Sequence, residues 1–202
     1  MFKKLLLITF LIPSFSAVAS PEKDFDEFVS YFENRFPDTP FEDYKNGVYS
    51  IDKSAREQWE AMEEFPPYEL NVDRGEELFN RPFKNGNTYG SCFENDGIGI
   101  RQNYPYFDTE KNKVVTLEGA LNDCRVKNGE KPLSYFKGKE LAHVSAYMAY
   151  TSRGNKFDIQ IPNTKEALDA YEDGKRLYFT KKGQLNFSCA DCHVYQTGTK
   201  LR

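Results

Sequence analysis

The sequence predicts a mostly α-helical protein. Apolar residues recur at helical spacing in several segments, and capping residues and glycines mark where these segments begin and end. A pattern of glycine, leucine and an aromatic residue also occurs twice, each time ahead of a Ser-Cys pair. The chain has 202 residues, of which 39% are hydrophobic and 15% aromatic, so it can bury a core.

Composition and charge exclude several classes of protein. Charged residues make up 29% of the chain and the mean hydropathy is -0.70, which excludes a protein with many membrane spans. The apolar and aromatic content is too high for a disordered chain. Because the net charge is -4 and the body of the chain has no run of Lys or Arg, we expect no nucleic-acid partner.

The first 19 residues have the pattern of a secretory signal peptide. Lys3 and Lys4 precede an apolar run over 5–12, and Ala17 and Ala19 form a small-residue cleavage site. The apolar run is too short to span a bilayer, so a membrane anchor is the weaker alternative. We therefore expect cleavage near Ala19, a location in the periplasm, no membrane contact after cleavage, and an oxidising compartment in which cysteines can pair.

The segment that follows the signal peptide, residues 20–70, is polar, acidic and aromatic. Short helices are expected over 24–36 and 54–65. Prolines follow each of them and favour irregular connectors. We expect this segment to be an N-terminal wrap rather than a separate domain.

Residues 71–154 predict the first of two units. Helices are expected over 72–79, 116–129 and 139–152, whereas 95–113 is rich in turn-forming residues. The second and third of these helices each have an apolar stripe at helical spacing, formed by Leu117, Ala120, Leu121 and Cys124 in one and by Leu141, Val144 and Met148 in the other.

Capping signals place the ends of the later helices. Thr116 is expected to cap its helix and Gly129 to end it. A linker is expected over 155–165. Within it Asn163, followed three residues later by a glutamate, resembles a capping box. The helix that begins there opens a second unit over 166–202.

The pattern that occurs twice predicts an internal duplication. Gly-x-x-Leu-aromatic begins at Gly75 and again at Gly174, and the Ser-Cys pairs that follow end at Cys92 and Cys189. Only nine residues follow His193. These are too few to complete a second domain of ordinary size, so we expect that the chain is truncated.

Residues 189–193 read C-x-x-C-H, the attachment signature of c-type haem. Two thiols one helical turn apart can each bond a vinyl group of the porphyrin, and the adjacent histidine then supplies the proximal iron ligand. We therefore expect Cys189 and Cys192 to hold one haem c covalently and His193 to bind its iron. A disulfide between the two cysteines, a thioredoxin-like site and a zinc site are the alternatives.

The other two cysteines are Cys92 and Cys124. In an oxidising compartment we expect them to form a disulfide, and the alternative is that one of their thiols binds the haem iron. His143 lies away from the apolar stripe of its helix, so we expect it in solvent rather than on the iron. Met148 lies on the stripe, which favours a place in the core.

Residues 178–193, YFTKKGQLNFSCADCH, resemble the second haem-site segment of the SoxA family, the larger subunits of the SoxAX cytochromes of periplasmic thiosulfate oxidation. The resemblance extends over about 72–202 and is most specific over 171–193. It implies tandem cytochrome-c-like domains, the first haem-free with a disulfide and the second incomplete in this chain. Cys92 and Cys124 would then form the disulfide of the haem-free domain.

The resemblance also implies an activity, that of the haem subunit of an L-cysteine S-thiosulfotransferase. The family couples thiosulfate oxidatively to a cysteine of the SoxYZ carrier protein, passes two electrons to a c-type cytochrome, and pairs with a small SoxX-like cytochrome subunit. The family's catalytic cysteine follows C-x-x-C-H on a later helix, so we expect it beyond Arg202 and expect this chain alone to be inactive. The alternative function is simple periplasmic electron transfer by a cytochrome c.

Overall fold

The computed structural model describes residues 20–199 and is mostly helical. The predicted signal peptide therefore lies outside the described residues. The elements in chain order are α1 (Pro21–Arg35), η1 (Phe41–Ser50), α2 (Lys53–Met62), α3 (Glu69–Asn80), η2 (Tyr89–Cys92), η3 (Glu94–Gly97), η4 (Arg101–Asn103), β1 (Tyr106–Asp108), β2 (Lys113–Val115), α4 (Leu117–Lys127), α5 (Glu140–Thr151), α6 (Lys165–Phe179) and the π-helical turn η5 (Asp191–Tyr195).

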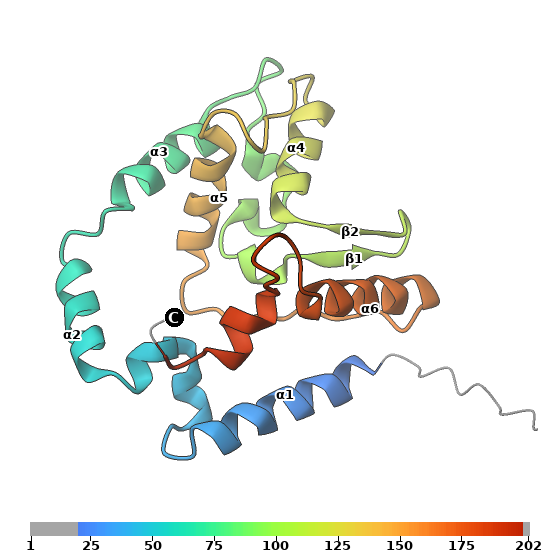
Figure 1. The fold of residues 1–202 in the computed structure, drawn as a ribbon. Helices are drawn as coiled ribbons and strands as arrows, with labels where there is room; N and C mark the ends of the chain where they lie inside the picture. Colours follow the sequence, from blue (N-terminus) through green and yellow to red (C-terminus); the bar gives the residue numbers. More distant parts are fainter. Residues whose placement is uncertain (1–19, 200–202) are drawn as a thin grey trace, which may run out of the picture.

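The core of the described chain is formed by α3, α4, α5 and the short turns between α3 and α4, as the upper half of Figure 1 shows. Its centre is the crossing of α3 and α5, where Gly75 is buried. A Cβ at this position would overlap the backbone carbonyl of His143 and would lie 2.8 Å from the Cβ of Tyr147. Glycine is therefore required for the two helices to approach this closely. The buried members of the core are Leu78, Phe79, Phe83, Tyr89, Ile100, Leu117, Leu121, Cys124, Leu141, Val144 and Met148.

A short antiparallel hairpin lies where only turns were expected. β1 and β2 pair with Tyr106 opposite Val115 and Asp108 opposite Lys113. The Asp108 carboxylate accepts hydrogen bonds from the backbone of Glu110 and Lys111, so it closes the turn between the strands. Strands of three residues are too short to leave an alternating pattern in the sequence, which is why the prediction for 95–113 was incomplete.

The helices expected from the sequence are present, with ends that differ by three residues or fewer. Thr116 caps α4 as predicted, because its hydroxyl accepts from the backbone of Gly119. The cap of α6 was assigned one residue too early. The side chain of Thr164, not of Asn163, accepts from the backbone of Ala167.

The segments α1, η1 and α2 lie outside the core and contribute no buried residue. They form the lower part of Figure 1, where α1 runs beneath α6 and the red segment that follows it. Asp24 of α1 accepts hydrogen bonds from the Lys175 ammonium at 2.6 Å and from the Tyr171 hydroxyl at 2.9 Å, both on α6. The Lys175 bond is the main reason that the pKa of Asp24 is lowered.

The repeated pattern occupies two helices in different surroundings. In α3, Gly75 and the Leu78-Phe79 pair are buried against α5. In α6 an added Cβ at Gly174 would meet nothing within 4 Å, and Leu177 is 55% exposed. Within residues 20–199, no helix therefore packs on α6 in the way that α5 packs on α3.

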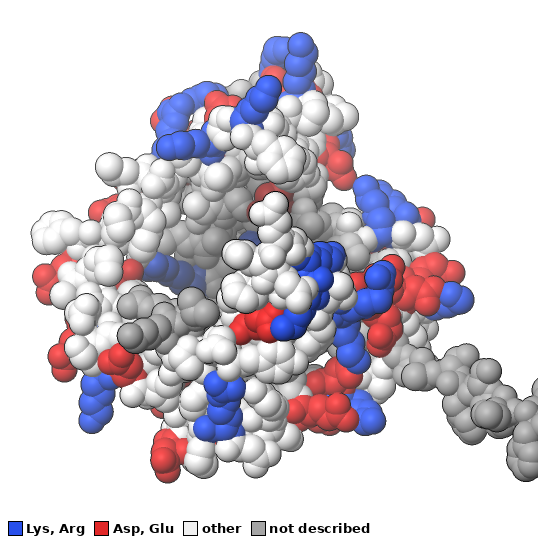
Figure 2. All heavy atoms as spheres, in the orientation of Figure 1, with Lys and Arg blue, Asp and Glu red and all other residues white. Residues whose placement is uncertain are grey.

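Charged side chains of both signs are interspersed over the face drawn in Figure 2, without an extended patch of one sign. Among the described helices, none combines the length and the apolar character needed to cross a bilayer. His143 is half-buried on α5, and its backbone carbonyl forms part of the contact with α3.

Replacing Gly75 by alanine should lower the free energy of unfolding by about 1–3 kcal/mol, because the added methyl group forces α3 and α5 apart. Urea or thermal unfolding measures this change. Gly174→Ala is the matched control, since its Cβ would enter open space and alanine favours helix by about 0.5–1 kcal/mol. Equal effects of the two substitutions would contradict a special role for the crossing at Gly75.

The Asp24 interaction should make stability depend on pH in the acidic range. Since the folded-state pKa is lowered, Asp24 stabilises the fold above its unfolded-state pKa, and this contribution is lost as the pH falls through the folded-state pKa. Asp24→Asn should therefore reduce the melting temperature at pH 7, and the difference from the unmodified chain should shrink below about pH 4. The exposed Asp26 on the same helix provides the control Asp26→Asn, which should change the melting temperature little.

Candidate functional site

The four cysteines form two pairs that differ in chemical state. Cys92, at the end of η2, is bonded to Cys124 on α4, with an S–S distance of 2.08 Å and a Cα–Cα distance of 5.8 Å. The expected disulfide is therefore confirmed, and neither of these thiols is available to bind iron. Cys189 and Cys192 are unbridged.

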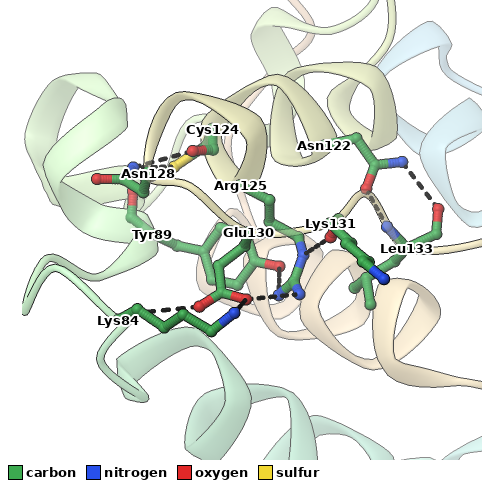
Figure 3. Close-up of polar contacts among 9 residues, drawn as sticks. All are labelled: Lys84, Tyr89, Asn122, Cys124, Arg125, Asn128, Glu130, Lys131 and Leu133. Carbon is green, nitrogen blue, oxygen red and sulfur yellow. Dashed lines mark hydrogen bonds and ion pairs between the residues drawn. The ribbon is translucent and has the colours of Figure 1, made fainter.

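Asn128, just after α4, contacts both cysteines of the disulfide, and Figure 3 draws its contact with Cys124. Its buried amide donates to the Cys124 carbonyl at 2.9 Å and lies 3.4 Å from the sulfur of Cys92. Its side-chain oxygen accepts from the amides of Asn85 and Asn87, both at 2.8 Å. The polar groups of this buried residue are thus satisfied, as burial in the core requires.

Arg125 ties the same region to the chain that follows α4. Its guanidinium donates to the Lys131 carbonyl at 2.8 Å and to the Tyr89 hydroxyl at 3.3 Å (Figure 3). It also lies 3.9 Å from the Glu130 carboxylate. The disulfide and these side-chain contacts join η2, α4 and the following loop into one closed unit that carries no thiol for a haem.

The C-x-x-C-H motif lies on a helical segment that begins at Cys189 and continues through η5. Ala190 and Val194 are buried, with exposed fractions of 0% and 4%. Cys189 and His193 are exposed, and Cys192 is half-buried. One face of this segment therefore packs inward, and the other presents the first thiol and the imidazole to the outside.

The helical segment begins with a capping box that was not among the sequence predictions. The backbone and hydroxyl of Ser188 donate to the Asp191 carboxylate at 2.7 and 2.9 Å, and the backbone of Asp191 donates to the Ser188 hydroxyl at 3.1 Å. These bonds, the Ser188 backbone first, lower the pKa of Asp191, and Lys181 at 3.4 Å adds to this effect. The sequence signal was the Ser-x-x-Asp spacing, which overlaps the haem motif.

The segment that follows the motif is anchored by two interactions. The Thr197 hydroxyl donates to the His193 carbonyl at 2.7 Å. Arg35 on α1 donates to the carbonyls of Tyr195 and Thr197 at 2.9 and 3.1 Å. The position of the His193 backbone is thus connected by hydrogen bonds to the N-terminal helix.

The residues present fit a covalently attached haem. Two unbridged thiols and an exposed imidazole lie on one short helical segment. Exposed apolar side chains, which would suit the apolar face of a porphyrin, occur on both sides of the motif: Leu177, Phe179, Leu185, Phe187 and Tyr195. Zinc is less suitable, because no group of three or more His, Cys, Asp or Glu side chains among residues 20–199 is arranged to hold a metal ion.

Removing the disulfide should destabilise the chain. Replacing both Cys92 and Cys124 by serine should lower the free energy of unfolding by roughly 2–4 kcal/mol, because the unfolded chain loses a constraint between residues separated by 32 positions. Chemical denaturation of the haem-free chain measures this. Cys189→Ser is the control, since that side chain is exposed and unbridged, and a loss of equal size there would contradict the assignment.

Comparison with known proteins identifies the first unit. Residues 74–157 match the family model described as "SoxA/TsdA, cytochrome c domain". The match includes the α3–α5 crossing and the disulfide and does not include the C-x-x-C-H motif. The cytochrome c domain is the domain type of c-type haem proteins, so the matched unit has that type of fold without its own attachment motif.

Similar proteins are named L-cysteine S-thiosulfotransferase subunit SoxA. The chain is 51% identical over 181 residues to the protein of Chlorobaculum tepidum, covering 90% of this chain and 62% of that protein. It is 50% identical over 185 residues to the protein of Allochromatium vinosum, covering 91% of this chain and 65% of that protein. The chain thus spans less than two thirds of the length of these relatives.

A solved structure shares the fold. The crystal structure of SoxXA from P. pantotrophus aligns with a TM-score of 0.58 at 28% identity, over 68% of this chain and 52% of the matched chain. The family model, the two relatives and this structure all point to SoxA proteins. The chain is related to the SoxA proteins over about 90% of its length.

Proposed function

We propose that this chain binds one haem c through Cys189, Cys192 and His193. The observation that carries the proposal is the different state of the two cysteine pairs. The pair in the matched cytochrome c domain is oxidised to a disulfide, whereas the pair in C-x-x-C-H is unbridged and accompanied by an exposed histidine. We therefore propose that the chain consists of a haem-free unit over 71–154, a linker over 155–165 and the start of a haem-binding unit from 166.

The chain's own residues would do three things at this site. The Cys189 and Cys192 thiols form the thioether bonds, and the His193 imidazole supplies a nitrogen ligand. The Ser188–Asp191 capping box fixes the start of the segment, so the thiols are held one turn apart before attachment. A bound haem would supply one-electron redox chemistry, which thiols and imidazole lack.

The names of the relatives support a proposal about the wider activity. We propose that the chain is the haem-bearing part of an L-cysteine S-thiosulfotransferase, which couples thiosulfate to a cysteine of a SoxYZ carrier protein and partners a SoxX-like subunit. The names of the relatives and the SoxXA structure support a transferase subunit over a simple electron carrier. All four cysteines are assigned to the disulfide or to haem attachment, so the part described here provides haem rather than a nucleophilic thiol.

A periplasmic location belongs to the same proposal. Its support is the charged and apolar pattern of residues 1–19, together with the disulfide of the first unit. Disulfides form and persist in oxidising compartments such as the periplasm. Retention of the uncleaved leader on protein recovered from the periplasm would contradict cleavage near Ala19.

Haem attachment can be tested by intact mass after periplasmic expression with the c-type haem maturation system. We expect one added haem, which is lost when Cys189 and Cys192 are both replaced by alanine. The double variant of Cys92 and Cys124 to serine should keep its haem, since the disulfide lies in the other unit. Haem that remains after both motif cysteines are removed, or two haems per chain, would contradict the proposal.

A further inference from the structure

The N-terminal helix α1 contacts the segment that carries C-x-x-C-H, although the two are far apart in the sequence. The Arg35 guanidinium at the end of α1 donates to the carbonyls of Tyr195 and Thr197, which lie 160 and 162 positions away. Tyr195 is the last residue of η5 and Thr197 lies two residues beyond it, at the end of the helix where backbone acceptors have no partner within the helix. A cation at this end also interacts favourably with the helix dipole.

The contact continues from Arg35 to His193 in two steps. Arg35 holds the carbonyl of Thr197 at 3.1 Å, and the hydroxyl of the same threonine donates to the His193 carbonyl at 2.7 Å. Arg35 is itself fixed, because it donates to the Tyr31 hydroxyl at 2.8 Å and lies over the ring of Phe36 at 5.6 Å. A side chain fixed on one helix therefore restrains the backbone of the proposed iron ligand.

We propose that Arg35 is a positioning residue for the haem-binding segment and that it acts on His193 through Thr197. This inference rests on the proposed function, because restraining His193 matters for function when its imidazole binds the haem iron. Arg35 touches neither the proposed thiols nor the imidazole. Its effect is to limit the range of positions that the motif backbone can adopt.

Two further contacts join the N-terminal segment to the C-terminal part of the described chain. A Cβ at Gly198, where φ is +79°, would lie 2.6 Å from the ring of Phe36 and 3.1 Å from Ile51. The chain after the motif thus packs directly on the N-terminal segment. At the other end of α1, Asp24 is bonded to Lys175 and Tyr171 of α6. The helix is therefore attached both to the motif segment and to the helix that precedes it.

An apolar pocket of about 240 Å³ is lined mostly by the N-terminal segment, including Phe28, Phe32, Phe36 and Tyr44, and its remaining lining residues are Thr197 and Gly198 of the chain after the motif. The chain after the motif therefore meets the apolar side of the N-terminal segment, and the hydrogen bonds of Arg35 add a directional contact to this apolar one.

The test is amide hydrogen exchange of the full chain, read on peptides that cover 189–198, in haem-free and haem-loaded protein. Arg35→Ala should speed exchange there about tenfold. The reason is that the loss of hydrogen bonds from a charged donor makes local opening of the segment easier. Arg35→Lys should restore part of the protection, since it keeps the charge but not the forked donor. The control is Lys23→Ala, which removes one positive charge from an exposed i,i+4 pair on the same helix.

Thr197→Val keeps the side-chain shape and removes the hydroxyl that bonds the His193 carbonyl, without changing α1. It should speed exchange over 189–194 while the core peptides stay protected. If Arg35→Ala unfolds the chain globally, this second variant decides the question. Exchange in Thr197→Val equal to that of the unmodified chain would overturn the connection from Arg35 to His193.

The haem-loaded chain gives an independent readout. Arg35→Ala and Thr197→Val should each change the Soret circular dichroism and shift the haem midpoint potential, Arg35→Lys should shift them less, and Lys23→Ala should leave them unchanged. Identical spectra and potentials in all four variants would overturn the proposal. If no haem attaches to the unmodified chain, the proposed function fails, whereas hydrogen exchange in the haem-free protein still decides whether Arg35 positions the segment.

Discussion

The close approach of α3 and α5 at Gly75 is the constraint on which the folded unit depends. With no side chain at this position, the two helices come close enough to bury Leu78, Phe79 and Val144 between them and their neighbours. The disulfide then ties η2 to α4, so the short turns between α3 and α4 are held against the helix pair. Packing and a covalent link together hold this unit, which has no C-x-x-C-H motif of its own.

The second occurrence of the pattern shows that burial of a helix face depends on a partner helix as well as on the sequence of the helix itself. α6 repeats the glycine, leucine and aromatic residue of α3, yet Gly174 faces open space and Leu177 is exposed. The same local sequence is buried in one place and exposed in the other. Hydrophobic spacing thus specifies which face of a helix is able to bury, and the presence of a neighbour determines whether it does.

The sequence predicted the helices, the Thr116 cap and the Cys92–Cys124 disulfide, because each depends on residues close together or on a small number of cysteines. The hairpin of β1 and β2 was missed because three-residue strands carry no readable period. The Ser188–Asp191 capping box was readable but overlapped a stronger motif. The contact of Arg35 with Tyr195 could not be predicted from one sequence, since no local pattern relates residues 160 positions apart.

These long-range contacts change the role of the N-terminal segment. Its helices bury no residue of their own, so they add little to the core. Polar contacts of the segment reach α6 through Asp24, the end of the motif segment through Arg35, and Arg153 just after α5 through Glu63. The cytochrome c unit has its own core and disulfide, whereas the C-x-x-C-H segment is contacted by the N-terminal segment through Arg35, so the two ends of the described chain lie against each other.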